Sequence, residues 1–157
     1  MSHEFDYTIL IWTIVVGFVY VIYLRSLNYK KDPIWTILFA LISGGISSVL
    51  LSLLIYEFIG FNNFYLTAVF IAGPVEESAK FLTLILIYPI LKNNFDELTD
   101  GILYAGLVAL GFATIENYFY AFNATDKYQI LVLRSFFSIV GHISFSIVFG
   151  ILSNVST

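Results

Sequence analysis

Residues 64–91 of the chain read FYLTAVFIAGPVEESAKFLTLILIYPIL. The stretch is apolar enough to cross a bilayer, yet Gly73-Pro74 interrupts it and Glu76, Glu77 and Lys80 follow. A charged side chain at membrane depth is costly, so it normally faces the interior of a helical bundle instead of lipid. The segment therefore predicts a helical membrane protein that encloses a polar site.

The composition indicates the same class of protein. Hydrophobic residues make up 59% of the 157 residues and charged residues only 11%, whereas a soluble domain carries about a quarter charged residues. The length fits one integral membrane domain over residues 1–157. The chain has no cysteine, which excludes disulfides and thiolate metal sites. Its net charge of −4, without a basic patch, predicts no nucleic-acid partner.

Five hydrophobic segments are close to the roughly 20 residues that a membrane-spanning helix needs. They predict an all-α, polytopic transmembrane bundle of about five spans, with the third span broken near Gly73-Pro74. The expected spans run from about Tyr7 to Leu24, Ile34 to Tyr56, Phe64 to Leu91, Asp100 to Phe122, and Tyr128 to Leu152.

Basic residues are unevenly distributed over the loops between these spans. The loops after spans one and three hold most of them, Arg25, Lys30, Lys31 and Lys92, whereas the loops after spans two and four hold Lys127. Loops rich in lysine and arginine stay in the cytoplasm. This distribution predicts a multi-pass protein of the cell membrane with its N-terminus outside and its C-terminus in the cytoplasm.

Small residues recur every four positions on two of the spans. One row is formed by Gly101, Ala105, Ala109 and Ala113, and a second by Gly44, Ser48 and Ser52. Rows of small side chains let membrane helices approach each other closely. Both rows predict tight helix contacts in the bundle.

The glutamate pair lies where a helix is expected to begin. Pro74 suits the first turn, because its missing N–H would be unsatisfied there anyway, and a helix start stabilises nearby carboxylates. Lys80 is one turn from Glu76 and three residues from Glu77, so it can pair with either. A purely structural alternative is a broken helix that these charges cap and stabilise.

Glu116 and His142 are the other candidates at membrane depth. Glu116 shares a helix face with Phe112 and Tyr120; the structural alternative is a glutamate near the outer membrane surface. His142 is flanked by Ser138 and Ser146. It could be a neutral histidine bonded to a hydroxyl, or an acid, base or metal ligand.

The expected depths allow these residues to meet. At 1.5 Å per residue, Glu76 lies about 18 Å from the outer end of its span, Glu116 about 10 Å and His142 about 21 Å. Arg134 precedes His142 by two turns and is expected to pair with a carboxylate or a lipid headgroup. We therefore expect one buried polar point shared by three helices.

Three motifs follow one another along the same part of the chain. Residues 76–80 read EESAK, residues 100–106 read DGILYAG and residues 111–117 read GFATIEN. They resemble the EExxK, DGxxYG and GFAxxEN segments of PrsW-type intramembrane proteases, and Arg134 followed by Gly141-His142 resembles that family's next helix. The family is related to the CAAX prenyl endopeptidases, whose FxxxH motif would correspond to Phe112 followed by Glu116.

The resemblance implies a multi-helix fold with a buried polar cavity and peptide-bond hydrolysis inside the membrane. Characterised members act on membrane-anchored anti-sigma factors, so a membrane-anchored protein is the expected partner within the lipid bilayer. Members usually carry a further helix with a last His, Asn or Asp motif, and the sequence up to Thr157 has none after His142. A truncated chain, a shorter active relative and an inactive protein would each explain this difference.

The resulting hypothesis is a glutamate-dependent endopeptidase. Glu76 is the expected general base that deprotonates a water, and Glu77 orients Glu76 or shares its proton. Glu116 and His142 would hold the water and stabilise the oxyanion. A divalent metal such as zinc could be held by Glu77, Glu116 and His142. The supporting residues are expected to be Lys80, Phe112, Asn117 and Arg134.

Two other classes of function also fit an acidic pair in a broken helix. A small ion- or proton-coupled transporter places such residues near the membrane midplane, although the five spans show no inverted repeat. A catalytically inactive scaffold of the same fold would bind other transmembrane segments without cleaving them. The sequence does not indicate an oligomeric state.

Overall fold

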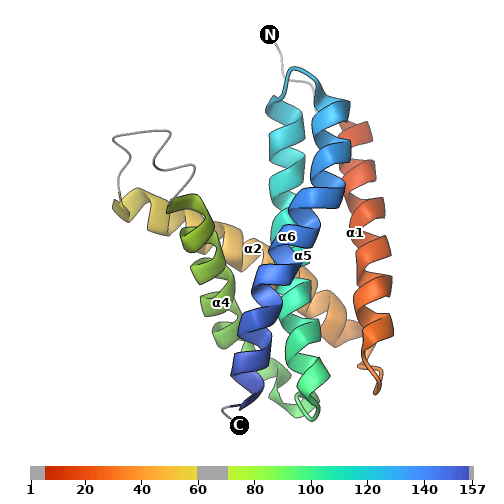
Figure 1. Ribbon diagram of the computed structural model, residues 1–157, viewed down its shortest axis with the longest axis vertical. Helices are drawn as coiled ribbons and strands as arrows, with labels where there is room; N and C mark the ends of the chain where they lie inside the picture. Colours follow the sequence, from red (N-terminus) through yellow and green to blue (C-terminus); the bar gives the residue numbers. More distant parts are fainter. Residues whose placement is uncertain (1–5, 60–70, 156–157) are drawn as a thin grey trace.

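All regular elements in the described part of the chain, residues 6–59 and 71–155, are helices. This computed structural model contains α1 (Tyr7–Leu27), α2 (Ile34–Ile59), α4 (Ala72–Leu91), the short 3-10 helix η2 (Lys92–Asn94), α5 (Leu98–Asn123) and α6 (Lys127–Val155), as Figure 1 shows. The predicted all-α bundle is confirmed.

Four of these helices, α1, α2, α5 and α6, are long and apolar enough to cross a membrane. The helix α4 corresponds to the third expected span but contains Glu76, Glu77 and Lys80, which distinguishes it from the other four. Residues 64–70 of that expected span lie outside the described residues. Because α4 begins at Ala72, Pro74 falls in its first turn, as the sequence predicts.

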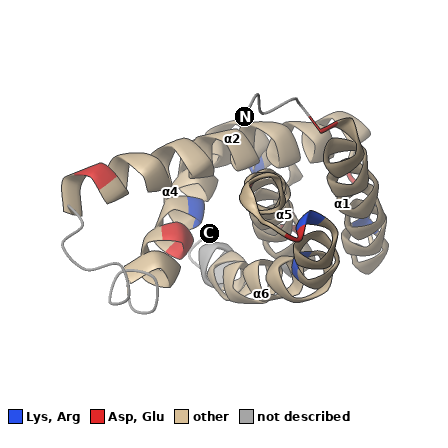
Figure 2. Ribbon diagram, turned by 90° about the horizontal axis from the view of Figure 1, so that it is seen from above, with Lys and Arg blue, Asp and Glu red and all other residues tan. Residues whose placement is uncertain are grey.

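The centre of the bundle is α5, with the other helices arranged around it (Figure 2). Within its most apolar window 67% of α5 is buried, compared with 28% for α1 and for α6. The helix α2 crosses the bundle obliquely, and α4 packs mainly against α2. The start of α1 and the end of α6 lie at opposite ends of the bundle (Figure 1). The side of the membrane on which each end lies stays a prediction.

The small-residue rows lie at close helix contacts. A Cβ atom added to Gly44, in the second row, would lie 2.6 Å from Cγ2 and 3.3 Å from Cα of Val108 on α5. On α6, a Cβ added to Gly150 would lie 2.3 Å from the carbonyl oxygen of Gly101. The backbones of α2 and α6 therefore both touch α5, which confirms the predicted tight contacts.

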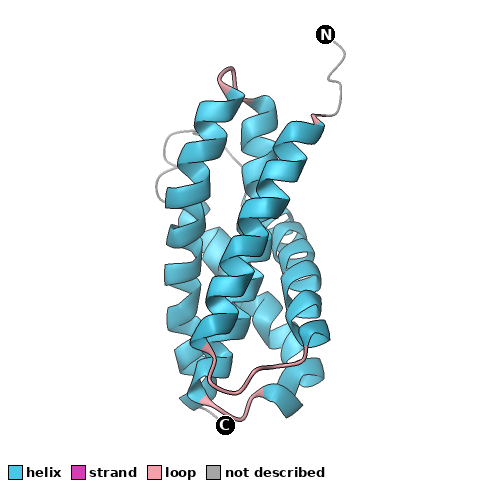
Figure 3. Cartoon of the chain, turned by 90° about the vertical axis from the view of Figure 1, so that its right-hand side faces the viewer, coloured by secondary structure: helices cyan, strands magenta, loops and turns pink. Residues whose placement is uncertain are grey.

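Two loops are joined at the end of the bundle opposite the start of α1 (Figure 3). The amide of Asn28 donates to Asp32 Oδ2 over 3.1 Å and to Asp100 Oδ1 over 3.0 Å. The other oxygen of Asp100 accepts from the backbone N–H groups of Asp96 and Glu97, at 2.9 and 2.6 Å. These bonds fix the start of α5. Burial raises the pKa of the Asp32 carboxyl.

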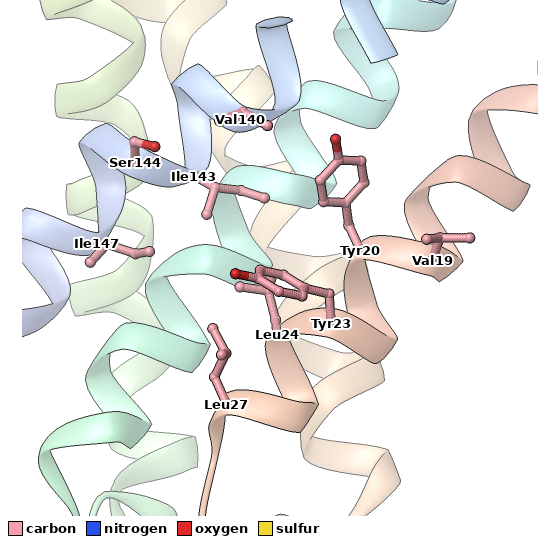
Figure 4. Close-up of a pocket in the computed structure, with 9 residues that line it drawn as sticks. All are labelled: Val19, Tyr20, Tyr23, Leu24, Leu27, Val140, Ile143, Ser144 and Ile147. Carbon is pink, nitrogen blue, oxygen red and sulfur yellow. The ribbon is translucent and has the colours of Figure 1, made fainter. Parts of the chain in front are cut away.

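A cavity of about 500 Å³ lies between α1 and α6 (Figure 4). Its lining residues are all uncharged: Val19, Tyr20, Tyr23, Leu24, Leu27, Val140, Ile143, Ser144 and Ile147. The Tyr20 hydroxyl donates to the carbonyl oxygen of Ser135 over 3.1 Å. The cavity therefore offers mostly apolar surface, and its lining contains no carboxylate, imidazole or ammonium group.

Candidate active site

The first half of α4 supplies two glutamates and a lysine to one polar cluster. The Lys80 ammonium donates to Glu77 Oε1 over 2.6 Å, which is one of the two pairings expected from their spacing. The hydroxyl of Ser146, on α6, donates to Glu77 Oε2 over 3.0 Å. Both oxygens of Glu77 are thus bonded. The Lys80 side chain is only 1% exposed, and its ammonium lies 4.3 Å from the centroid of the Phe112 ring.

The histidine of α6 lies between the charged residues of α4 and α5. Its Nδ1 atom is 2.6 Å from the Lys80 ammonium, and its Nε2 atom is 3.0 Å from Glu116 Oε2. Because an ammonium group can only donate, Nδ1 of His142 must accept from Lys80 and the ring proton is assigned to Nε2. The ring then donates to Glu116. The Phe112 ring packs edge-on against the imidazole, with centroids 5.3 Å apart.

An arginine of α6 completes the contact with α5. Arg134 forms an ion pair with Glu116, and its Nε atom donates to Asn117 Oδ1 over 2.8 Å. It also donates to the Ser138 hydroxyl over 3.1 Å. Arg134 therefore pairs with a carboxylate, as expected, and holds Glu116 against His142.

Glu76 has a different environment from the other two carboxylates. The Tyr56 hydroxyl, at the far end of α2, donates to Glu76 Oε1 over 3.1 Å. Within residues 6–59 and 71–155, no basic side chain lies within ion-pair distance of Glu76. One carboxylate oxygen each from Glu76 and Glu116 and one ring nitrogen of His142 all lie within 4.8 Å of one another. Glu76 is therefore inside the cluster but is not neutralised by it.

A cavity of about 520 Å³ between α4 and α6 reaches this cluster. Its lining combines polar site residues with aromatic and backbone surface: Gly73, Pro74, Glu76, Glu77, Phe137, Ser138, Gly141, His142 and Phe145. A molecule in the cavity would meet the carboxylates of α4 on one wall and the imidazole of α6 on the other.

Two of the contacting residues lie outside the predicted set. Tyr56 is far from Glu76 in sequence, and nothing in the local spacing indicates the contact, because it depends on the oblique path of α2. Ser146 flanks His142 in the sequence, which leaves open a histidine that is bonded to a hydroxyl. Ser146 bonds to Glu77 instead, and the histidine is bonded to charged residues.

These observations define a helical membrane protein with a buried cluster of carboxylates and a histidine shared by three helices. Residues 32–156 match the family described as PrsW family intramembrane metalloprotease, and the chain belongs to this family.

Curated relatives agree with that assignment. Protease PrsW of Clostridioides difficile (strain 630) is 34% identical over 132 residues, which are 78% of this chain and 55% of the relative. Protease PrsW of Oceanobacillus iheyensis is 33% identical over 136 residues, 81% of this chain and 61% of the relative. The chain thus matches little more than half the length of these relatives. No solved structure matches the chain.

The family description implies a metal ion, and the residues present fit one. Glu76, Glu116 and His142 each offer a ligand atom within the 4.8 Å span. Carboxylate oxygens and imidazole nitrogens are both zinc ligands, and catalytic zinc sites use three protein ligands and leave a fourth position open. The predicted set with Glu77 in place of Glu76 stays a prediction; in the structure Glu77 is bonded to Lys80 and Ser146.

Proposed function

We propose that the chain is an intramembrane endopeptidase that hydrolyses a peptide bond of a membrane-anchored protein with a water activated by a glutamate of α4. The observation that carries the proposal is the convergence of Glu76, Glu116 and His142, from three different helices, within 4.8 Å beside a cavity. Burying these ionisable groups together costs free energy, and ionisable groups inside a membrane normally mark a functional site.

The contacts of each glutamate support Glu76 as the base. Glu77 is bonded to an ammonium and a hydroxyl, and Glu116 is bonded to an arginine and an imidazole. In both residues the carboxylate already takes part in hydrogen bonds with charged or polar groups. Glu76 accepts a hydrogen bond from the Tyr56 hydroxyl and lines the cavity, so it is best placed to take a proton from water.

The hydrolytic step follows from these positions. A water in the cavity that is hydrogen-bonded to Glu76 gives one proton to Glu76 while its oxygen attacks the scissile carbonyl carbon. The oxyanion that forms is stabilised by the positive charge of Lys80, whose ammonium lies 2.6 Å from His142. Glu76 then returns the proton to the amide nitrogen, the C–N bond breaks, and a carboxylic acid and an amine are released.

A metal would change which glutamate performs which task. When bound, zinc would polarise the scissile carbonyl and lower the pKa of its bound water; Glu76, Glu116 and His142 would hold it. Glu77 is then the remaining carboxylate of α4 beside the cavity that could take the proton. The glutamate pair therefore supplies a ligand and a base in this case.

The proposal is tested with a single-pass reporter anchored by the transmembrane segment of a membrane-anchored anti-sigma factor. We expect Glu76→Gln and His142→Ala each to lower the cleavage rate by about 10²- to 10⁴-fold. The matched control is Glu57→Gln, an exposed glutamate of α2, which should cleave at the wild-type rate. Mass spectrometry of the products identifies the bond.

Wild-type cleavage by both site variants would overturn the proposal. Ion flux in liposomes that depends on Glu77, with no cleavage of any reporter, would instead support the transporter alternative. Capture of the reporter without turnover by the unmodified chain would support the inactive scaffold.

A further inference from the structure

Two glycines that line the cavity between α4 and α6 differ from the other glycines in their surroundings. Among the described residues, no atom lies within 4 Å of a Cβ atom built on Gly73 or Gly141, whereas one built on Gly45, Gly111 or Gly150 would collide with a neighbouring helix. Glycine inside a helix costs about 1 kcal/mol relative to alanine. The packing of the described residues does not account for that cost at Gly141.

The surroundings of Gly141 form a notch in the surface of α6. Phe137 and Phe145 lie one turn before and one turn after it, and both line the same cavity. Their exposed fractions are 76% and 67%, so both rings project from the bundle. Between the two rings, Gly141 itself contributes only backbone. Opposite the notch, Gly73 and Pro74 form the wall on α4.

This groove leads to the reactive groups. Glu76, Glu77 and His142 line the same cavity of about 520 Å³, which is within the usual range of about 300–1,000 Å³ for ligand sites. A lipid tail in the cavity would not be stabilised by the three ionisable side chains, because an apolar tail cannot form hydrogen bonds with them. A peptide offers both apolar side chains for the phenylalanines and polar backbone groups for the cluster.

We propose that the groove binds the substrate as an extended segment, with its main chain against Gly141 and Gly73 and its scissile bond beside Glu76. This inference rests on the proposed proteolytic function and names Gly141 as a specificity-determining position. In a helix the scissile carbonyl is bonded and enclosed by side chains, whereas an extended chain exposes it. Positions without a Cβ allow another backbone to approach closely.

The first experiment increases the side chain at residue 141. We expect kcat/KM for the single-pass reporter to fall in the order Gly141→Ala, Gly141→Val, Gly141→Leu, with leucine lowering it by about 100-fold because the scissile bond is displaced. The thermal unfolding midpoint of Gly141→Ala should not fall, because no atom of the described residues lies within 4 Å of the added Cβ. The matched control is Ser144→Leu, on the same helix but lining the cavity between α1 and α6; it should cleave like the wild type.

A binding experiment separates the groove from the chemistry. Phe145 is replaced by p-benzoylphenylalanine in the full chain carrying Glu76→Gln, and the reporter is captured by irradiation in lipid vesicles. We expect capture with Gly141 and at least a tenfold loss of capture with Gly141→Leu, by the same displacement. Equal capture by the chain with Gly141 and the chain with Gly141→Leu would overturn the proposal that the groove binds the substrate, regardless of the cleavage rates.

The two proposals therefore fail differently. Wild-type cleavage by Gly141→Leu would overturn the groove while the losses in Glu76→Gln and His142→Ala still supported proteolysis. Conversely, wild-type cleavage by both site variants would overturn the proposed mechanism, and capture that depends on Gly141 would still support the groove as a peptide site.

Discussion

The Lys80 ammonium of α4 and the Glu116 carboxylate of α5 contact opposite nitrogens of the same imidazole ring, at 2.6 and 3.0 Å from His142. The ring is thereby fixed at both ends before any substrate arrives. Such support from neighbouring side chains is what keeps a site in its productive geometry.

Removing the Lys80 charge should damage stability and activity together. In Lys80→Met, Glu77 loses its cationic partner while its side chain stays only 16% exposed. Breaking a buried ion pair on one side costs about 3–5 kcal/mol, so the unfolding midpoint in detergent should fall clearly. The double variant Lys80→Met/Glu77→Gln should regain most of the stability but not the cleavage rate. An unchanged midpoint in the single variant would contradict this account of Glu77.

Arginine should not be replaceable by lysine at residue 134. Arg134 bonds to Glu116, Asn117 and Ser138 at once, and a lysine ammonium cannot reproduce that planar arrangement. We expect Arg134→Lys to lose about 2 kcal/mol of stability, the value of a charged hydrogen bond, and to lower kcat more than it raises KM. Steady-state kinetics together with thermal unfolding separate the two effects. Equal kcat in both proteins would argue against a positioning role for Arg134.

Metal content should follow the three residues that lie within 4.8 Å of one another. If the purified chain carries about one zinc ion, as a catalytic zinc site requires, then Glu116→Gln and His142→Ala should each lose it. Glu77→Gln should keep the ion and lose cleavage. Elemental analysis of the four proteins checks this directly. Retention of zinc by both Glu116→Gln and His142→Ala would place the ion elsewhere.

Two glycine-to-alanine substitutions should differ in their effect on folding. Gly111→Ala would place a methyl group 2.1 Å from the carbonyl oxygen of Leu41, and overpacking of this kind costs about 1–3 kcal/mol. Gly73→Ala meets no atom within 4 Å and should leave the unfolding midpoint unchanged or higher. Thermal unfolding of both variants in the same detergent tests the contrast, and equal midpoints would contradict the close contact of α2 with α5.

Stability should depend on pH through Asp32, which lies in the loop between α1 and α2. Burial raises its pKa in the folded chain, so the folded state binds its proton more tightly than the unfolded state does. This stabilisation is complete below the unfolded pKa of about 3.9 and is lost as the pH rises through the folded-state value. Asp32→Asn should remove that loss.

The measurement is the difference in unfolding midpoint between the wild type and Asp32→Asn from acidic to neutral pH. Relative to the wild type, the unfolding midpoint of Asp32→Asn should rise as the pH rises. The substitution also alters the hydrogen bonds from Asn28 and Asn94 to Asp32, but it does so equally at acidic and at neutral pH. The pair formed by Lys30 with Asp96 lowers the pKa of Asp96 and is present in both proteins. A difference that does not change with pH would contradict the assignment.

Much of the fold could be predicted because its determinants are local. The lengths of the apolar segments predicted the helices, and the spacing of Gly101, Ala105 and Ala109 predicted a closely packed α5. The start of α4 near Pro74 followed from the chemistry of one residue. Each of these patterns is set by the periodicity of a single helix and needs no knowledge of its neighbours.

The partners within the site could be predicted only in part. Glu77 with Lys80 follows from helical spacing, and counting depths indicated that Glu116 and His142 could meet. The contact of Tyr56 with Glu76 could not be predicted, because it requires the oblique crossing of α2 over the bundle. Nor could spacing show that Lys80 would also reach His142, which depends on how α4 approaches α6.

Five glycines in the described part of the chain fall into two groups that differ in what a larger side chain would meet. At Gly45, Gly111 and Gly150 the adjacent helix leaves no room for a methyl group, so inheritance of the architecture requires glycine whatever the protein acts on. At Gly73 and Gly141 the atoms of the described residues impose no such requirement. We expect lineages with different physiological targets to diverge at the second pair and not at the first three, which a comparison of sequences between such lineages would test.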